Sequence, residues 1–146
     1  MDRDRVDPDQ LIQTLGLVPH PEGGWYTQTW RAVADGERSA GTAIYFLLRA
    51  GERSHWHRID SAEIWHHYAG AAIELATWVE GGPIEQRLLG DDVLGGEQPQ
   101  LVVRPGEWQS ARSLGAWTLV GCTVAPGFEF DHFELADPEW APPAKP

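Results

Sequence analysis

A short stretch in the middle of the chain gathers side chains that can bind a metal or move a proton. It reads Ser54-His55-Trp56-His57-Arg58 and, after a short gap, Glu63-Ile64-Trp65-His66-His67. Because side chains alternate between the two faces of a strand, His55 and His57 are expected to share one face. Two imidazoles and a carboxylate that meet across a hairpin can hold iron, nickel, manganese, copper or zinc.

The same side chains can also work without a metal. Imidazole titrates near neutral pH, so His57 or His67 can act as a general base or acid. Glu63, Trp65 and His67 share one parity, which predicts that Trp65 lines a cavity and stacks on a ligand. His67 is equally well explained as a core histidine with satisfied hydrogen bonds. Metal binding and metal-free acid–base chemistry therefore both stay open.

Alternating strands and turns are expected to position these residues. Asp7 as N-cap, Pro8 in the first turn and Gly16 as the stop predict one short helix. Apolar runs separated by Gly and Pro turns follow and predict an all-β sandwich or barrel. The expected strands are Trp25–Arg31, Thr42–Arg49, Glu63–Ala69, Ala72–Val79, Ile84–Leu89, Leu101–Arg104, Trp117–Ala125 and Phe128–Leu135.

Composition limits the classes of function. The chain has 146 residues, which predicts a single domain over 1–146. Four prolines after Asp137 predict an extended tail from 137 to 146. Its formal net charge is −11, so nucleic acid and anionic membranes are poor partners. The charged start, Met1-Asp2-Arg3-Asp4-Arg5, leads into no apolar segment, so no secretory signal is expected. A cytoplasmic location is the expectation.

The histidine-rich stretch resembles the first motif of the cupin superfamily, which reads Gly, His-x-His, Glu and Gly. Glu63 and Gly70 keep the spacing of that motif, whereas the gap from His57 to Glu63 is one residue longer. The second cupin motif is similar to Arg104-Pro105-Gly106-Glu107-Trp108-Gln109, where Gln109 stands in place of a histidine. The resemblance implies a metal site formed by His55, His57, Glu63 and Gln109. Glutamine is a weaker metal ligand than histidine.

A narrower resemblance covers about residues 11–135. The segment Pro19-His20-Pro21-Glu22-Gly23-Gly24-Trp25-Tyr26, with later motifs in the same order, is similar to an uncharacterised family of small single-domain cupins. This resemblance implies a jelly-roll β-sandwich with a cavity, usually as a homodimer, but no settled reaction. The segment is explained as a tight turn at least as well as by a binding role. Glu22 and Tyr26 are expected to contact a ligand.

Together these features predict a cupin that binds a small polar or carbohydrate-like molecule. Three hypotheses stay open: an enzyme, either metal-dependent or a metal-free epimerase or isomerase; a binding module without catalysis; and a structural dimer with a vestigial site. Some arginines could anchor a carboxylate or phosphate of the ligand. The candidates are Arg31, Arg49, Arg58 and Arg104.

Overall fold

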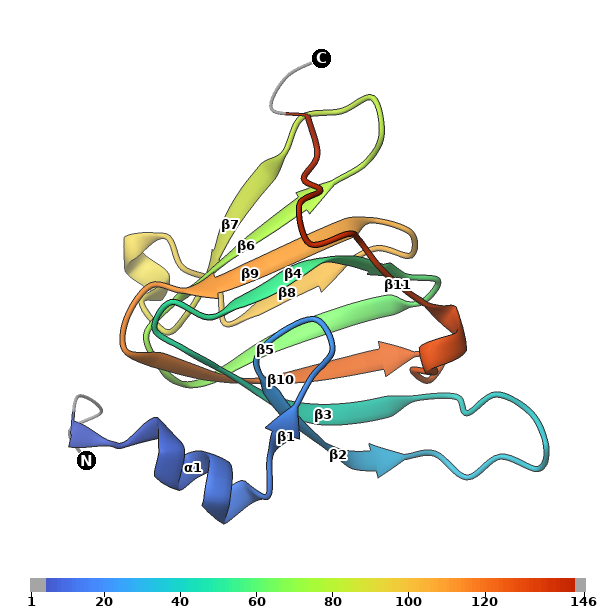
Figure 1. Ribbon diagram of the computed structural model, residues 1–146, viewed down its shortest axis with the longest axis horizontal. Coiled ribbons are helices and arrows are strands. Elements are labelled where there is room, and N and C mark those ends of the chain that lie inside the picture. Colours follow the sequence, from blue (N-terminus) through green and yellow to red (C-terminus); the bar gives the residue numbers. More distant parts are fainter. Residues whose placement is uncertain (1–4, 144–146) are drawn as a thin grey trace.

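The computed structural model describes residues 5–143 and consists of two antiparallel sheets packed face to face (Figure 1). The first sheet has the order β1-β2-β3-β10-β5-β8, and the second has the order β11-β4-β9-β6-β7. This arrangement is a jelly-roll β-sandwich, as expected from the sequence. The strands are β1 (Val18–Pro19), β2 (Trp25–Arg31), β3 (Thr42–Arg49), β4 (Arg53–Ile59), β5 (Ala62–Gly70), β6 (Ile73–Trp78), β7 (Glu85–Leu89), β8 (Gln100–Val103), β9 (Trp108–Ser113), β10 (Trp117–Ala125) and β11 (Phe133–Leu135).

Helix α1 (Pro8–Leu15) begins and ends where the sequence predicts. The side chain of Asp7 accepts a hydrogen bond from the backbone N–H of Asp9, which caps the first turn. Gly16 adopts the left-handed conformation at the C-terminal end, with φ at 69°, and thereby stops the helix. The helix lies beside β1, outside the sandwich (Figure 1).

Two parts of the strand prediction are corrected by the structure. The predicted strand Phe128–Leu135 is instead an irregular segment, a 3₁₀ turn η3 (Phe130–His132) and the short β11. Strand β9 was not among the predicted strands, although it pairs with both β4 and β6. Its sequence, Trp108 to Ser113, mixes polar and small residues and therefore has little apolar alternation to indicate a strand.

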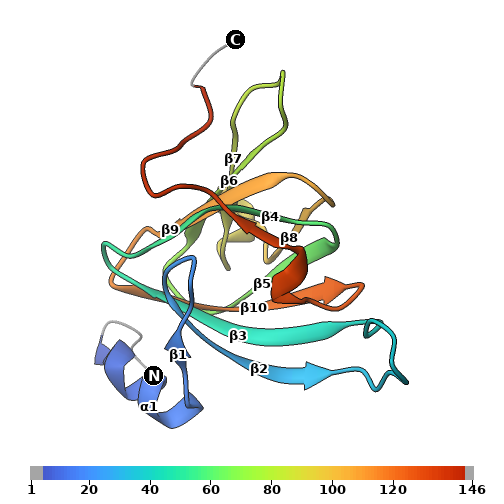
Figure 2. The same cartoon turned by 45° about the vertical axis from the view of Figure 1, so that its right-hand side comes forward.

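The core fills the space between the sheets at one end of the sandwich. Phe46, Leu48, Trp65, Leu75 and Val120 are each at most 2% exposed and belong to one cluster of buried side chains. At the other end the sheets are spanned by η3, which lies between β4 and β11 on one side and β3 and β10 on the other (Figure 2). The space behind η3 holds the candidate site.

Residues 136–143, which follow β11, contain no further strand or helix but are anchored to the second sheet. Trp140 packs against Trp56, Trp78 and Trp108, with ring centroids 4.8–6.5 Å apart. Residues 144–146 of the predicted tail and residues 1–4 of the predicted charged start lie outside the described residues. No helix in the described part of the chain is long and apolar enough to cross a membrane.

Candidate functional site

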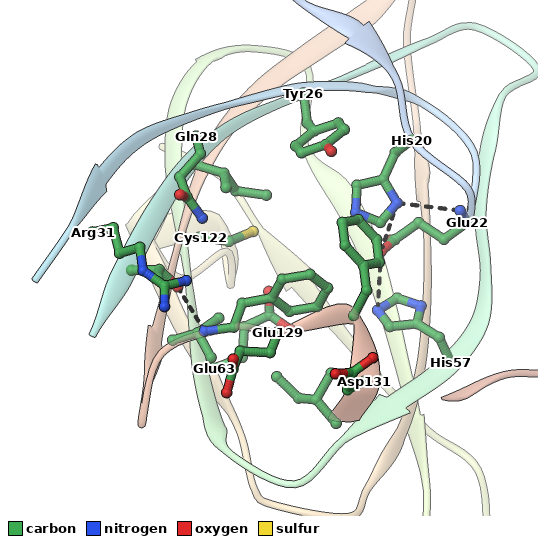
Figure 3. Close-up of a pocket in the computed structure, with 16 residues that line it drawn as sticks. His20, Glu22, Tyr26, Gln28, Arg31, His57, Glu63, Cys122, Glu129 and Asp131 are labelled. Atoms are coloured by element: carbon green, nitrogen blue, oxygen red, sulfur yellow. Dashed lines mark hydrogen bonds and ion pairs between the residues drawn. The ribbon is translucent and has the colours of Figure 1, made fainter. Parts of the chain in front are cut away.

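A cavity of about 430 Å³ opens at the η3 end of the sandwich (Figure 3). Its wall combines titratable side chains with aromatic and aliphatic ones, which is typical of a site for a small polar molecule. The lining residues are His20, Glu22, Tyr26, Gln28, Arg31, Thr42, Ile44, His57, Ile59, Glu63, Cys122, Val124, Phe128, Glu129, Phe130 and Asp131.

The loop between β1 and β2 brings His20 and Glu22 into this cavity. Gly23 has a φ of 110°, and a Cβ there would overlap the carbonyl oxygen of Arg53, so only glycine allows the loop to lie this close to β4. The backbone N–H of His55 donates to the carbonyl of Glu22 at 2.8 Å, which fixes the loop against β4. The Gly-Gly turn therefore serves to place the two side chains that precede it.

A register shift in β4 decides which of its side chains face the cavity. Ser54 pairs with Ala111 and His57 pairs with Gln109, so three steps along β4 match two steps along β9, as at a β-bulge. Ser54 and His57 consequently both point inward and are at most 3% exposed. The prediction that His55 shares the face of His57 is not met. The Nε2 of His55 bonds instead to the carbonyl of Asp137 at 2.8 Å, away from the cavity.

A second register shift in β2 acts in the same way. Gln28 pairs with Ile44 and Trp30 pairs with Ala43, so Thr29 is the extra residue. The shift turns Arg31 to the cavity side together with Gln28, three positions before it (Figure 3). Strict alternation from Gln28 would have directed Arg31 outward.

Glu22 lies at the centre of the hydrogen bonds in the cavity. Its Oε1 is 3.3 Å from Nδ1 of His20 and 3.5 Å from Nε2 of His57, and its Oε2 accepts from the hydroxyl of Ser54. Nδ1 of His57 donates to the carbonyl of His55 at 2.7 Å, which leaves its Nε2 as an acceptor. Nδ1 of His20 accepts from the backbone N–H of Glu22 at 3.2 Å, so its proton is on Nε2.

Both imidazoles therefore present an unprotonated nitrogen to Oε1 of Glu22. The lone pair of His20 Nδ1 is already engaged by the backbone N–H of Glu22, whereas that of His57 Nε2 needs a donor, which Oε1 supplies only when it carries a proton. Glu22 is thus expected to be a neutral carboxylic acid whose proton points towards His57. A neutral acid beside neutral imidazoles can both give and take a proton, which is the requirement for acid–base chemistry.

Burial favours the same protonation states. It raises the pKa of Glu22 to about 8, against a partial opposing effect of the hydrogen bond from Ser54. Burial, assisted by the nearby His57, lowers the pKa of His20 to about 3. The pKa of His57 is also lowered by burial, although the charge of Glu63 opposes this. Burial raises the pKa of Glu63, with His57 opposing and Glu22 adding to the rise. Burial therefore favours the uncharged form of each of these four side chains.

The residues expected from the sequence to bind a metal do not form a metal site. Oε1 of Gln109 accepts from the indole N–H of Trp65 at 2.9 Å, and its amide nitrogen donates to Oε1 of Glu63 at 2.7 Å. An indole N–H can only donate, so the amide oxygen must face Trp65 and not the cavity. Since His55 also points elsewhere, only His57 and Glu63 of the expected four line the cavity. Within residues 5–143, no group of three His, Cys, Asp or Glu side chains is arranged to hold a metal.

The other predicted site residues have mixed positions. Tyr26 lines the cavity, and its ring is 4.5 Å from that of His20. Trp65 is 1% exposed and packs edge-on against Phe46 in the core, so it lies behind the cavity wall. His67 bonds through Nε2 to the carbonyls of Gly70 and Ala71 at the far end of β5 and does not reach the cavity.

The mouth of the cavity is bordered by the segment from Phe128 to Asp131 (Figure 3). Arg38 holds this segment, because it donates to the carbonyl of Gly127 at 2.8 Å and lies 3.6 Å from the carboxylate of Glu129. The same guanidinium makes a two-pronged pair with Asp60. These ion pairs fasten one wall of the mouth to the loop between β4 and β5.

Sequence reasoning did not select His20, Ser54 or Gln28 as site residues. His20 lies in the Gly-Gly turn, where the turn alone was a sufficient explanation for the glycines. Ser54 and Gln28 reach the cavity only because of the register shifts in β4 and β2. No feature of the sequence marks either shift.

Comparison with known proteins finds a matching family model and solved structures that are more than 30% identical to this chain. A family model described as "Cupin superfamily (DUF985)" matches residues 9–136. Protein SO0799 from Shewanella oneidensis is 38% identical, with a TM-score of 0.86 over 90% of this chain and 85% of that one. A hypothetical protein from Leishmania major is 31% identical, with a TM-score of 0.82 over 90% and 88% of the two chains.

More distant structures share the fold alone. Oxalate decarboxylase from Bacillus subtilis is 14% identical, with a TM-score of 0.64 over 80% of this chain and 29% of that one. At this identity neither its activity nor the Mn(II) centres named for the same enzyme extend to this chain. The curated proteins give no match.

Proposed function

We propose that this chain, which belongs to the DUF985 family of the cupin superfamily, binds a small polar molecule in the η3-end cavity and transfers a proton on it through Glu22 and His57. The observation that carries the proposal is the arrangement of one carboxyl oxygen between two imidazole acceptors, inside a cavity of about 430 Å³. The reaction class is isomerisation or epimerisation next to a carbonyl group.

The proton transfers balance without a further reactant. His57 Nε2 accepts a proton from the carbon next to the ligand carbonyl, while Glu22 donates its proton to the carbonyl oxygen. The resulting imidazolium and carboxylate are neighbours at 3.5 Å and stabilise each other until the protons return. Return of the proton to a different face or carbon gives the isomer. No step requires a metal, in keeping with the orientation of Gln109 and His55.

The test is deuterium exchange at carbon, followed by proton NMR in D₂O. Small sugars and hydroxy ketones are incubated with the wild type, Glu22→Gln and His57→Gln, with His66→Gln as a control outside the cavity. His66 bonds to Thr123 and Gln100 on the outer face of the first sheet, so its loss should leave exchange unchanged. We expect a fall of about 10²–10⁴-fold in both cavity variants. Ligand binding without exchange in the wild type would contradict catalysis and favour a binding module.

The homodimer expected from the family resemblance is part of the proposal. Tyr45, His66 and Tyr68 contact one another on the outer face of the first sheet, where Tyr68 is 54% exposed. The strands of this sheet carry only three charged residues, of which two line the cavity and Arg49 pairs with Asp9 at one end. An uncharged face on a chain of net charge −11 is the surface where two copies meet without repulsion.

Light scattering after gel filtration tests this assembly. We expect a dimer for the wild type and a monomer for Tyr68→Glu. Val79→Glu is the matched control, because Val79 is 56% exposed but belongs to the turn after β6 in the other sheet. A monomeric wild type, or dimers that persist in Tyr68→Glu, would contradict this use of the face.

A further inference from the structure

We propose that the ligand of the cavity is a small carboxylic acid, whose carboxylate binds Arg31 and Gln28 at the mouth while its hydroxyl or carbonyl oxygen reaches Glu22 at the inner end. The inference rests on the proposed function in that it uses the same cavity and the same inner groups. It adds the chemical class of the ligand and the residues that select it.

Within residues 5–143, Arg31 is a cation that lines the cavity without a carboxylate partner. Four other arginines lie 2.7–3.1 Å from an acidic side chain, namely Arg38, Arg49, Arg58 and Arg112. Arg31 makes no ion pair in the part of the chain that the structure describes, although acidic residues outnumber basic ones 22 to 11. It lines the cavity and is solvent-exposed at its mouth. An unpaired guanidinium at the entrance of a cavity is available to an anionic ligand.

Gln28 makes the position suited to a carboxylate in particular. The β2 register shift puts its amide on the same wall as Arg31, and Figure 3 shows both side chains on one side of the cavity. The planar guanidinium binds both oxygens of a carboxylate, and the amide N–H₂ of Gln28 can add a third hydrogen bond.

The inner end of the cavity does not repel such a ligand. Glu22 is neutral because its proton faces the acceptor nitrogen of His57, and Glu129 is paired with Arg38 and His132. Glu63 accepts a hydrogen bond from the amide of Gln109, and burial raises its pKa. Asp131 has no cationic neighbour among the described residues and lies across the cavity from Arg31 (Figure 3). The cavity therefore has a cation, Arg31, at one side of its mouth and neutral acid–base groups, Glu22 and His57, at its inner end.

The size and the walls restrict the ligand further. A volume of about 430 Å³ lies at the small end of ligand sites, which run from about 300 to 1,000 Å³. Between the two polar ends the wall includes Ile44, Val124 and Phe128, which can pack against a carbon skeleton. A single sugar ring or a short chain with a carboxylate at one end matches this layout.

Matched pairs of acids and neutral analogues test the inference by isothermal titration. The probes are glucuronate against glucose, and lactate against propane-1,2-diol. We expect the acid of a pair to bind at least about tenfold more tightly, because hydrogen bonds between a guanidinium and a carboxylate are stronger than those to a neutral hydroxyl. Arg31→Gln should abolish the preference and Arg31→Lys should restore part of it. Arg53→Gln is the control, because Arg53 is exposed and outside the cavity lining.

The binding and exchange experiments together distinguish the class of ligand from the proton-transfer reaction. Equal binding of acid and neutral partner, an unchanged preference in Arg31→Gln, or failure of every acid to bind would overturn the carboxylate inference. If acids bind through Arg31 but no deuterium exchange occurs, the inference stands and the proton-transfer function fails. If neutral sugars exchange deuterium without any preference for acids, the function stands and the inference fails.

Discussion

Replacement of Glu22 by glutamine tests whether the cavity holds a neutral acid. Glutamine keeps the shape of the side chain but cannot titrate. In the folded wild type the pKa of Glu22 is raised to about 8 from an ordinary value of 4.5. The contribution of Glu22 to the free energy of unfolding is therefore fully present below about pH 4.5 and is lost as the pH rises through about 8.

The histidines act in a separate pH range. The pKa of His20 is lowered to about 3 in the folded protein, so its contribution is present above about pH 6.5 and is lost as the pH falls through about 3. Between about pH 7 and 8 the change in the free energy of unfolding comes mainly from the carboxyl groups with raised pKa, Glu22 and Glu63. One proton changes it by about 1.4 kcal/mol per pH unit, which gives a loss of about 2 kcal/mol from pH 6.5 to 8 owing to Glu22.

Urea unfolding at several pH values, followed by tryptophan fluorescence, measures this loss. The wild type should lose stability between about pH 6.5 and 8, and Glu22→Gln should lose about 2 kcal/mol less over the same interval. The pKa of Glu63 is raised too, so the variant keeps a smaller decline. Glu80→Gln, at an exposed turn residue, is the control and should follow the wild type. Parallel curves for the wild type and Glu22→Gln would refute the assignment of a neutral Glu22.

Three further predictions concern the surroundings of Glu22. Ser54→Ala removes a hydrogen bond that lowers the pKa of Glu22, so in the same urea series the loss of stability should continue to higher pH than in the wild type, and an unchanged upper end of the loss would contradict this bond. Gly23→Ala forces a Cβ onto the carbonyl of Arg53 at a positive φ and should destabilise the fold by more than about 1 kcal/mol in urea titrations. Elemental analysis of the untagged protein by plasma mass spectrometry should find well under one transition-metal ion per chain. Near-stoichiometric metal that disappears in His57→Ala would instead require Gln109 or His55 to turn towards the cavity.

The fold could be predicted from the sequence largely because its local signals are explicit. Asp7, Pro8 and Gly16 mark the helix, and the apolar runs of β2, β3 and β10 coincide with the predicted strands. Strand β9 was missed because its pairing with β4 and β6 is long-range and its own residues alternate poorly. Local sequence patterns predict such strands poorly, because their formation depends on pairing and packing with distant parts of the chain.

The site was less accessible to sequence reasoning, and the reason is geometrical. Parity correctly directs Glu63 inward and fails for His55, because the register of β4 shifts between Ser54 and His57. His57 was identified, but its partner Glu22 comes from a loop 35 residues earlier, and nothing in the spacing joins them. Gln109 was located by its motif, whereas the direction of its amide depends on the donor Trp65.

The ion pairs of Arg38 have a consequence for how fast a ligand enters and leaves. The segment Phe128–Asp131 must move aside to widen the mouth, and Arg38 joins that segment to Asp60 across an exposed surface. Exposed ion pairs are worth at most about 1 kcal/mol each and weaken as salt screens them. The rates of ligand entry and release should therefore rise a few-fold with ionic strength, and the salt concentration of the solution would set how fast a ligand passes the mouth.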